Sequence, residues 1–356
     1  MLILSYLLTS PSCKKNSSIE PPPISDSLIT IEQVLADGQE PAVSPDGTRI
    51  AYTRDGSIYV MDTSGANIKQ ITQGNGDVLP RWRPDGQAIG FIRTVAGSYN
   101  QGLLYSVPSS GGAPTLINFG QPVADSLIEV SRVYTETAIP IWDWSYDASL
   151  IAYLAVKGSS TFLDVESLVS DSLILSREIF NANSANPTRS FAWSSKSNKL
   201  VFTSCLERSD GIILTYQPPL PPQIADTTYL FPSYITQSHQ VEEFSYYVYV
   251  NASRGPTIRS NDFAGNTAEY SVSSAAGLKW SPDNNYFLYE WEWTVGGALG
   301  YDYSRLYLFD RATGKQYKLT SEGDINYHDF FFDWGKNSNT VFSERFKKIY
   351  KIQFKH

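Results

Sequence analysis

A short frame of residues returns six times along this chain, and the repetition limits the choice of folds more than any other property. The first copy runs from Pro41 to Thr72 and reads as four short strands joined by tight turns. Ser44-Pro45-Asp46-Gly47 fits a type I turn that closes with a left-handed glycine. A single four-stranded meander buries too little apolar surface to be stable alone, so its recurrence decides the fold.

We call the first residue of this turn the anchor of its copy. The anchor is Ser44 in the first copy, and the anchors of the other copies are Arg83, Ser145, Ser194, Ser281 and Gly335. A tryptophan stands immediately before five of the six anchors, as Trp82, Trp144, Trp193, Trp280 and Trp334. The position six residues after each anchor is apolar in every copy. The pattern predicts an all-β propeller of four-stranded antiparallel blades, with the tryptophans filling the wedges between blades.

The number and closure of the blades follow from the spacing of the anchors. Six anchors predict six blades, and seven is the alternative, because the interval from Ser194 to Ser281 is long enough for a degenerate blade. Six is preferred because residues 249–255 resemble the third strand and turn of one interrupted blade. The last copy ends before a fourth strand, so residues 28–34 are predicted to become the outer strand of the last blade.

The frame resembles the repeat of the TolB-like β-propellers, which is built on W-S-P-D-G followed by I-A-F, I-Y and L-T. The residues that carry the resemblance are Ser44 to Gly47, Pro84 to Gly86 and Trp280 to Asp283, whereas the copies at Ser145, Ser194 and Gly335 depart from S-P-D-G. The resemblance covers residues 28–356, expected to form one domain. It implies an exported protein of the bacterial envelope that binds a partner.

The N-terminal residues are typical of an exported and anchored protein. Residues 1–12 are apolar but too few to span a bilayer, and Cys13 follows directly. Residues 1–13 therefore resemble a lipoprotein signal with lipidation at Cys13, the alternatives being another export signal or a plain apolar end. Residues 14–27, with three consecutive prolines, predict a flexible tether. The expected location is the periplasmic side or the outer surface of the cell envelope. Cys205, the second cysteine, is interpreted as a small apolar residue.

Long segments rich in aromatic residues are the main functional signal. Residues 93–102, 118–140, 206–245 and 291–304 are expected to be loops that gather on one face of the ring. Their candidate binding residues are Tyr99, Tyr134, Tyr229, Phe231, Tyr234, Trp291, Trp293, Tyr301 and Tyr303. Such side chains offer large contact areas with a polar group, which suits a protein or glycan partner, although they can equally pack the loops against the ring.

Charged residues stand directly before four of the frame tryptophans, as Arg81, Asp143, Lys279 and Asp333. Alternation along a strand puts each charge on the opposite face from the tryptophan beside it. Ion pairing between blades is the expected use, and coordination of water or a ligand near the central channel is the alternative.

No motif for catalysis is present. His239, His328 and His356 fit no metal-ligand spacing, and no nucleophile elbow or phosphate-binding loop occurs, so no catalytic residue, metal or other cofactor is expected. Glu290 and Glu292 are interpreted as a solvated strand edge.

The net charge of −8 disfavours nucleic acids and anionic membrane surfaces. The sequence favours a monomeric, non-enzymatic binding scaffold; the alternative is a hydrolase or lyase acting on carbohydrate or a small ester or lactone.

Overall fold

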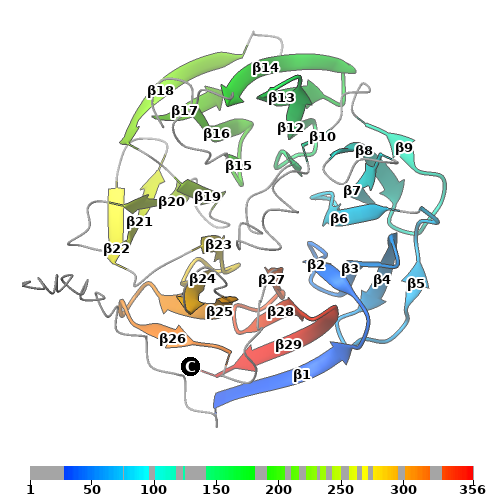
Figure 1. The fold of residues 1–356 in the computed structure, drawn as a ribbon, viewed down its shortest axis with the longest axis vertical. Helices are drawn as coiled ribbons and strands as arrows, with labels where there is room; N and C mark the ends of the chain where they lie inside the picture. The colour runs from blue at the N-terminus through cyan, green and yellow to red at the C-terminus, as the bar shows by residue number, and fades with distance from the viewer. Residues whose placement is uncertain are drawn as a thin grey trace, which may run out of the picture.

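The computed structural model describes residues 28–74, 76–95, 101–117, 123–124, 142–180, 191–204, 210–215, 222–230, 233–237, 243–249, 256–262, 267–271, 276–295, 301–320 and 331–355. The longer regular elements in these ranges are β-strands, and their sheets stand radially around one axis (Figure 1). The expected all-β propeller of four-stranded antiparallel blades is confirmed.

Five of the sheets are separate and have four antiparallel strands each. Three of them are β2 (Gln39–Val43), β3 (Arg49–Arg54), β4 (Ser57–Asp62) and β5 (Lys69–Gln70); β15 (Phe191–Trp193), β16 (Lys199–Ser204), β17 (Asp210–Thr215) and β18 (Gln223–Leu230); and β19 (Ser233–Gln237), β20 (Glu243–Tyr249), β21 (Pro256–Asp262) and β22 (Thr267–Ser271). The other two are β23 (Ala276–Trp280), β24 (Tyr286–Val295), β25 (Tyr301–Asp310) and β26 (Gln316–Lys318); and β27 (Phe332–Trp334), β28 (Thr340–Arg345), β29 (Lys348–Phe354) and β1 (Ile29–Leu35).

A nine-stranded sheet contains two further groups of four strands. They are β6 (Asp77–Trp82), β7 (Ala88–Thr94), β8 (Gln101–Pro108) and β9 (Thr115–Leu116), followed by β11 (Trp142–Trp144), β12 (Leu150–Lys157), β13 (Ser160–Ser167) and β14 (Ser172–Phe180). The short strand β10 (Val123–Ala124) pairs with both β8 and β12 and so joins the two groups.

The expectation of six blades is wrong, because β19 to β22 form a complete sheet of their own between Ser194 and Ser281. Residues 206–245, expected to be a loop, include all of β17, β18 and β19 and the start of β20. Tyr249 ends β20, the second strand of this sheet, and the third strand is β21 at Pro256–Asp262, whereas the sequence predicts the third strand and its turn at residues 249–255. The reason is local: the repeated frame marks the turn between the first two strands of a blade, and residues 238–242, between β19 and β20, do not carry it.

Side-chain hydrogen bonds explain why the anchor turns form. The Ser44 hydroxyl donates to Asp46 Oδ1 at 2.6 Å and accepts from the Arg49 N–H at 3.0 Å, which ties the turn to the next strand. Asp46 Oδ1 also accepts from the Thr48 N–H at 3.0 Å. The backbone φ of Gly47 is 70°, so the predicted left-handed position is confirmed. The turns at Ser145 and Ser281 repeat these contacts.

The N-terminal strand closes the ring as predicted. β1 pairs antiparallel with β29 from Ile29 opposite Phe354 to Leu35 opposite Ile349, and it becomes the outer strand of the sheet formed by β27, β28 and β29 (Figure 1). The two ends of the domain are therefore held together by a backbone ladder, and the outer edge of β29 is covered.

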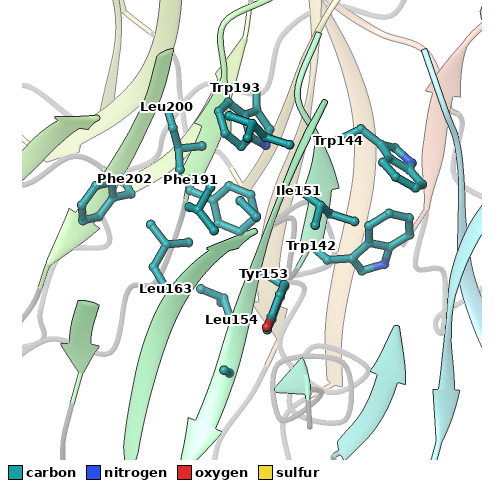
Figure 2. Packing of buried hydrophobic residues seen from close by; sticks show 14 of the residues in the cluster. Trp142, Trp144, Ile151, Tyr153, Leu154, Leu163, Phe191, Trp193, Leu200 and Phe202 are labelled. Atoms are coloured by element: carbon teal, nitrogen blue, oxygen red, sulfur yellow. The ribbon is translucent and has the colours of Figure 1, made fainter. Parts of the chain in front are cut away.

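The frame tryptophans fill the wedges between neighbouring sheets, as expected. All five are buried. Three of their indole N–H groups donate to a backbone carbonyl of the preceding inner strand: Trp82 to Ala42 at 2.9 Å, Trp193 to Asp143 at 3.2 Å and Trp334 to Lys279 at 3.1 Å. Figure 2 shows part of one core cluster, in which Trp193 lies near Phe191 and Leu200.

Candidate functional site

The strands β24 and β25 form a hairpin, and each is longer than the corresponding second or third strand of the other blades that carry an anchor turn. β24 has 10 residues, whereas β3 has 6 and β12 has 8, although all three begin five positions after their anchor. At about 3.3 Å per residue, β24 extends about 13 Å further than β3. Residues 291–295 and 301–304, expected to be loop, are therefore strand. The anchor turn and the hairpin tip lie at opposite ends of β24.

A row of cross-strand aromatic pairs runs along this hairpin. The rings of Phe287 and Phe309 are stacked with centroids 4.5 Å apart, and those of Tyr289 and Tyr307 are stacked at 5.5 Å. All four side chains are buried. Burial raises the pKa of Tyr289, whose hydroxyl donates to Gln316 Oε1 at 2.6 Å. This part of the row belongs to the core.

The register continues the row into the distal half of the hairpin. Trp291 pairs with Arg305, Trp293 with Tyr303 and Val295 with Tyr301. These positions alternate along both strands in phase with Phe287 and Tyr289, so they belong to the same face of the sheet. The fold therefore brings four of the predicted binding residues, Trp291, Trp293, Tyr301 and Tyr303, onto one hairpin.

The other predicted residues are not part of this group. Tyr229 lies in β18 and Tyr234 in β19, which belong to different sheets. The remaining predicted positions fall outside the described residues: Cys13, Tyr99, Tyr134, Cys205, Phe231, His239, His328 and His356.

The charges before the frame tryptophans form ion pairs between neighbouring inner strands, as the sequence predicted. Arg81 of β6 faces Asp143 of β11 at 3.9 Å, and Lys279 of β23 faces Asp333 of β27 at 3.2 Å. Asp333 also accepts hydrogen bonds from the Val43 N–H at 2.8 Å and the Trp334 N–H at 3.1 Å. All four charged side chains are between a quarter and a third exposed. Asp143 is surrounded by the inner strands, and the resulting loss of hydration raises the pKa of its carboxylate even though 26% of the side chain is exposed. The charge of Asp333 adds to this, while Arg81, the Trp144 N–H and Lys279 oppose it.

A pocket of about 370 Å³ on the β12–β13–β14 side of the ring was not predicted. Its lining includes Tyr153, Lys157, Asp164 and Glu166. The Tyr153 hydroxyl donates to Glu166, and the Lys157 ammonium lies 2.9 Å from an oxygen of Asp164 and 2.7 Å from the Ser176 hydroxyl. Asp164 and Glu166 occupy alternate positions of one strand, which is the sequence signal that could have marked a polar face there. These groups form two pairs in the lining of the pocket, Tyr153 with Glu166 and Lys157 with Asp164.

The part of the chain that the structure describes contains no helix with the length and hydropathy of a membrane span. No group of three or more histidine, cysteine or acidic side chains there is placed to hold a metal ion.

Comparison with known proteins supports the fold. No protein-family model and no curated sequence matches the chain. Oligogalacturonate lyase from Vibrio parahaemolyticus is similar in structure with 11% identity and a TM-score of 0.65, over 94% of this chain and 96% of that one. The β-propeller domain of the Trilobed protease from Pyrococcus furiosus is similar with 13% identity and a TM-score of 0.56, over 87% and 90%. TolB from Acinetobacter baumannii gives 13% identity and a TM-score of 0.48, over 82% of this chain and 65% of that one. At these identities the first two similarities show the fold alone, which is a β-propeller.

Proposed function

We propose that this protein is a non-enzymatic binding protein of the bacterial envelope, which presents the distal β24–β25 hairpin to a protein or glycan partner. The observation that carries the proposal is the aromatic register: Trp293 pairs with Tyr303 beyond the point at which β3 ends in its own sheet. Aromatic side chains on a projecting hairpin suit recognition because they give large contact areas at a small cost in conformational entropy.

The ring is the scaffold in this proposal. We count seven blades, taking the two four-stranded groups of the nine-stranded sheet as one blade each.

The chain is proposed to act as a monomer held to a membrane only by a lipid on Cys13, with residues 14–27 as the tether. The apolar start, the cysteine that follows it and the proline-containing linker support this location.

The contacts that Asp333 and Asp164 make among the described residues also favour binding over catalysis. Asp333 accepts from three donors and holds neighbouring inner strands together. Asp164 is engaged by Lys157. Carboxylates committed to such contacts are poor general acids or bases, because protonating or moving them breaks the packing of the ring.

One observation favours a second candidate function, a lyase or hydrolase acting on carbohydrate. The structure superposes on oligogalacturonate lyase with a TM-score of 0.65 over nearly the full length of both chains. A fold alone hosts many functions, so this candidate comes second. Incubation with oligogalacturonate and analysis of the products by mass spectrometry tests it: shortened or unsaturated products would support the enzyme.

Shortening the hairpin tests the binding function. Glu290 and Leu306 are register partners, so an Asn-Gly turn can replace residues 291–305 and leave the core pairs in place. We expect this variant to keep its melting temperature within a few degrees and to lose binding to envelope extract. Treating the extract with a protease or with glycosidases identifies the class of partner.

Tyr146→Ala is the matched control, because Tyr146 is an exposed aromatic residue of an anchor turn, at the other end of the blade from the hairpin tips. It should bind like the unaltered protein. Equal binding by the shortened hairpin and the unaltered protein would contradict the proposal.

A further inference from the structure

The junction between β6 and β11 departs from the pattern of the other wedges. Trp144 holds the same frame position as Trp82, Trp193 and Trp334, but its buried indole N–H has no hydrogen-bond partner in the described part of the chain. The indole N–H of Trp142, a fully buried side chain, likewise has none there. Two buried donors are therefore unused at one junction, which is a cost that folded proteins rarely accept without a reason.

Two indole rings, those of Trp142 and Trp144, share the wedge at this junction, and their crowding explains why this wedge differs from the others. The rings of Trp142 and Trp144 meet edge to face with centroids 5.8 Å apart (Figure 2). Gly90 of β7 makes room for them, because a Cβ atom at that position would lie 2.4 Å from Trp142. The glycine lets both indoles approach the neighbouring strand, at a position where any larger residue would exclude them.

The charged pair at this junction is also loosely joined. The closest approach of the Arg81 guanidinium to the Asp143 carboxylate is 3.9 Å, too long for a hydrogen bond. Asp143 accepts the Trp144 N–H at 2.9 Å, whereas Asp333 at the equivalent position accepts from three groups. The guanidinium lies 5.9 Å from the centre of the Trp142 ring, and the Arg81 side chain is 33% exposed. Within the described residues, therefore, a cation with no side-chain hydrogen bond of its own stands beside one of the indoles.

The chemistry of these groups defines what they can bind. Guanidinium and indole N–H groups only donate hydrogen bonds, and the guanidinium fork matches the paired oxygens of a carboxylate or phosphate. We propose that the Arg81–Trp142–Trp144 junction at the centre of the ring is a binding site for an oxyanion, either a carboxylate or a phosphate group. The site is separate from the β24–β25 hairpin and does not depend on the function proposed for it.

Asp143 makes this site sensitive to pH. Its negative charge competes with an incoming anion for Arg81. Because its pKa is raised, Asp143 takes up a proton and loses this charge at a higher pH than an ordinary aspartate does. The other charged groups that act on Asp143 are Lys279 and Asp333, which form their own pair at 3.2 Å. Binding of the oxyanion therefore strengthens as the pH falls towards the pKa of Asp143.

Nitrogen-15 NMR of the tryptophan side chains tests the site directly in the full chain. Sodium acetate and sodium phosphate are titrated separately against sodium chloride at constant ionic strength, with the indole signals assigned from Trp142→Phe and Trp144→Phe. We expect saturable shifts of the Trp142 and Trp144 signals, while those of Trp193 and Trp334, already hydrogen-bonded, stay in place. A response to acetate or to phosphate identifies the group that the site prefers.

Variants separate a binding site from a general salt effect. Arg81→Gln should weaken the response about tenfold or more. The matched control Arg83→Gln removes a more exposed arginine two residues away, paired with Asp85 in an anchor turn, and should change nothing. Asp143→Asn should bind more tightly at neutral pH and lose the pH dependence. Shifts that never saturate, or that are the same in Arg81→Gln, would overturn the proposal.

Discussion

At the scale of single residues, the anchor turns depend on a few polar contacts. The Ser44 hydroxyl and the Thr48 N–H hold the pKa of Asp46 at about 2, below its usual 3.8. For Asp147 and Asp283, burial acts to raise the pKa, but hydrogen bonds within their turns, together with one from Asn198 and one from Ser338 of the neighbouring blades, outweigh it and lower the pKa. A carboxyl group whose pKa is lower in the folded state stabilises the fold above its unfolded pKa and loses this contribution as the pH falls.

Acid should therefore destabilise the protein partly through these turns. Between about pH 5 and about pH 2, the free energy of unfolding should decrease, and Asp46→Asn should lose less of it than the unaltered protein, because one titrating group is gone. Urea unfolding followed by fluorescence at several pH values measures this. The same decrease in both proteins would contradict the assignment of the effect to Asp46.

The fourth position of the anchor turns offers a stabilising substitution. Ala148 has a φ of 57°, in a region that glycine adopts without steric cost, and the equivalent residue in the first turn is Gly47. Ala148→Gly should raise the free energy of unfolding by about 1 kcal/mol. Gly47→Ala should lower it, because a Cβ atom there would lie 2.2 Å from Lys336. Urea unfolding of both variants measures the two signs, and a loss of stability in Ala148→Gly would contradict the argument.

At the scale of elements, closure by β1 holds the ring together. β1 covers the outer edge of β29 and places Leu35 in the core, where burial of such a side chain contributes about 2 kcal/mol. Deleting residues 29–35 should lower the melting temperature strongly, because it removes this side chain and a full strand ladder. Deleting seven residues of the predicted tether, 15–21, is the matched control and should change it little. Equal melting temperatures in a thermal unfolding experiment would refute the closure as a source of stability.

The same elements explain what could be predicted from the sequence. The turn with the S-P-D-G pattern is a local signal, so the blades whose anchors are Ser44, Arg83 and Ser281 were recognisable, and the missing fourth strand of the last blade indicated β1. The sheet from β19 to β22 was missed because it lacks this local frame. The length of the β24–β25 hairpin was missed because cross-strand pairing sets it, and the glycines at its tip, residues 296, 297 and 300, resemble those of a loop.

At the scale of the whole molecule, the proposed function assigns structural and binding roles to opposite faces of the ring. The anchor turns of the blades lie at one end of the second strands, and the β24–β25 hairpin extends from the other end. The ion pairs between inner strands lie around the axis. A partner that binds the hairpin therefore contacts one face of the ring and leaves the turns of the other face untouched.

Hydrogen–deuterium exchange of the full chain, with and without a partner retained in the binding assay, tests this account most directly. The account predicts slower exchange in residues 291–305 on binding, with unchanged exchange in the anchor turns at residues 44–48, 145–149 and 281–285. Slower exchange in those turns, with none in residues 291–305, would contradict it.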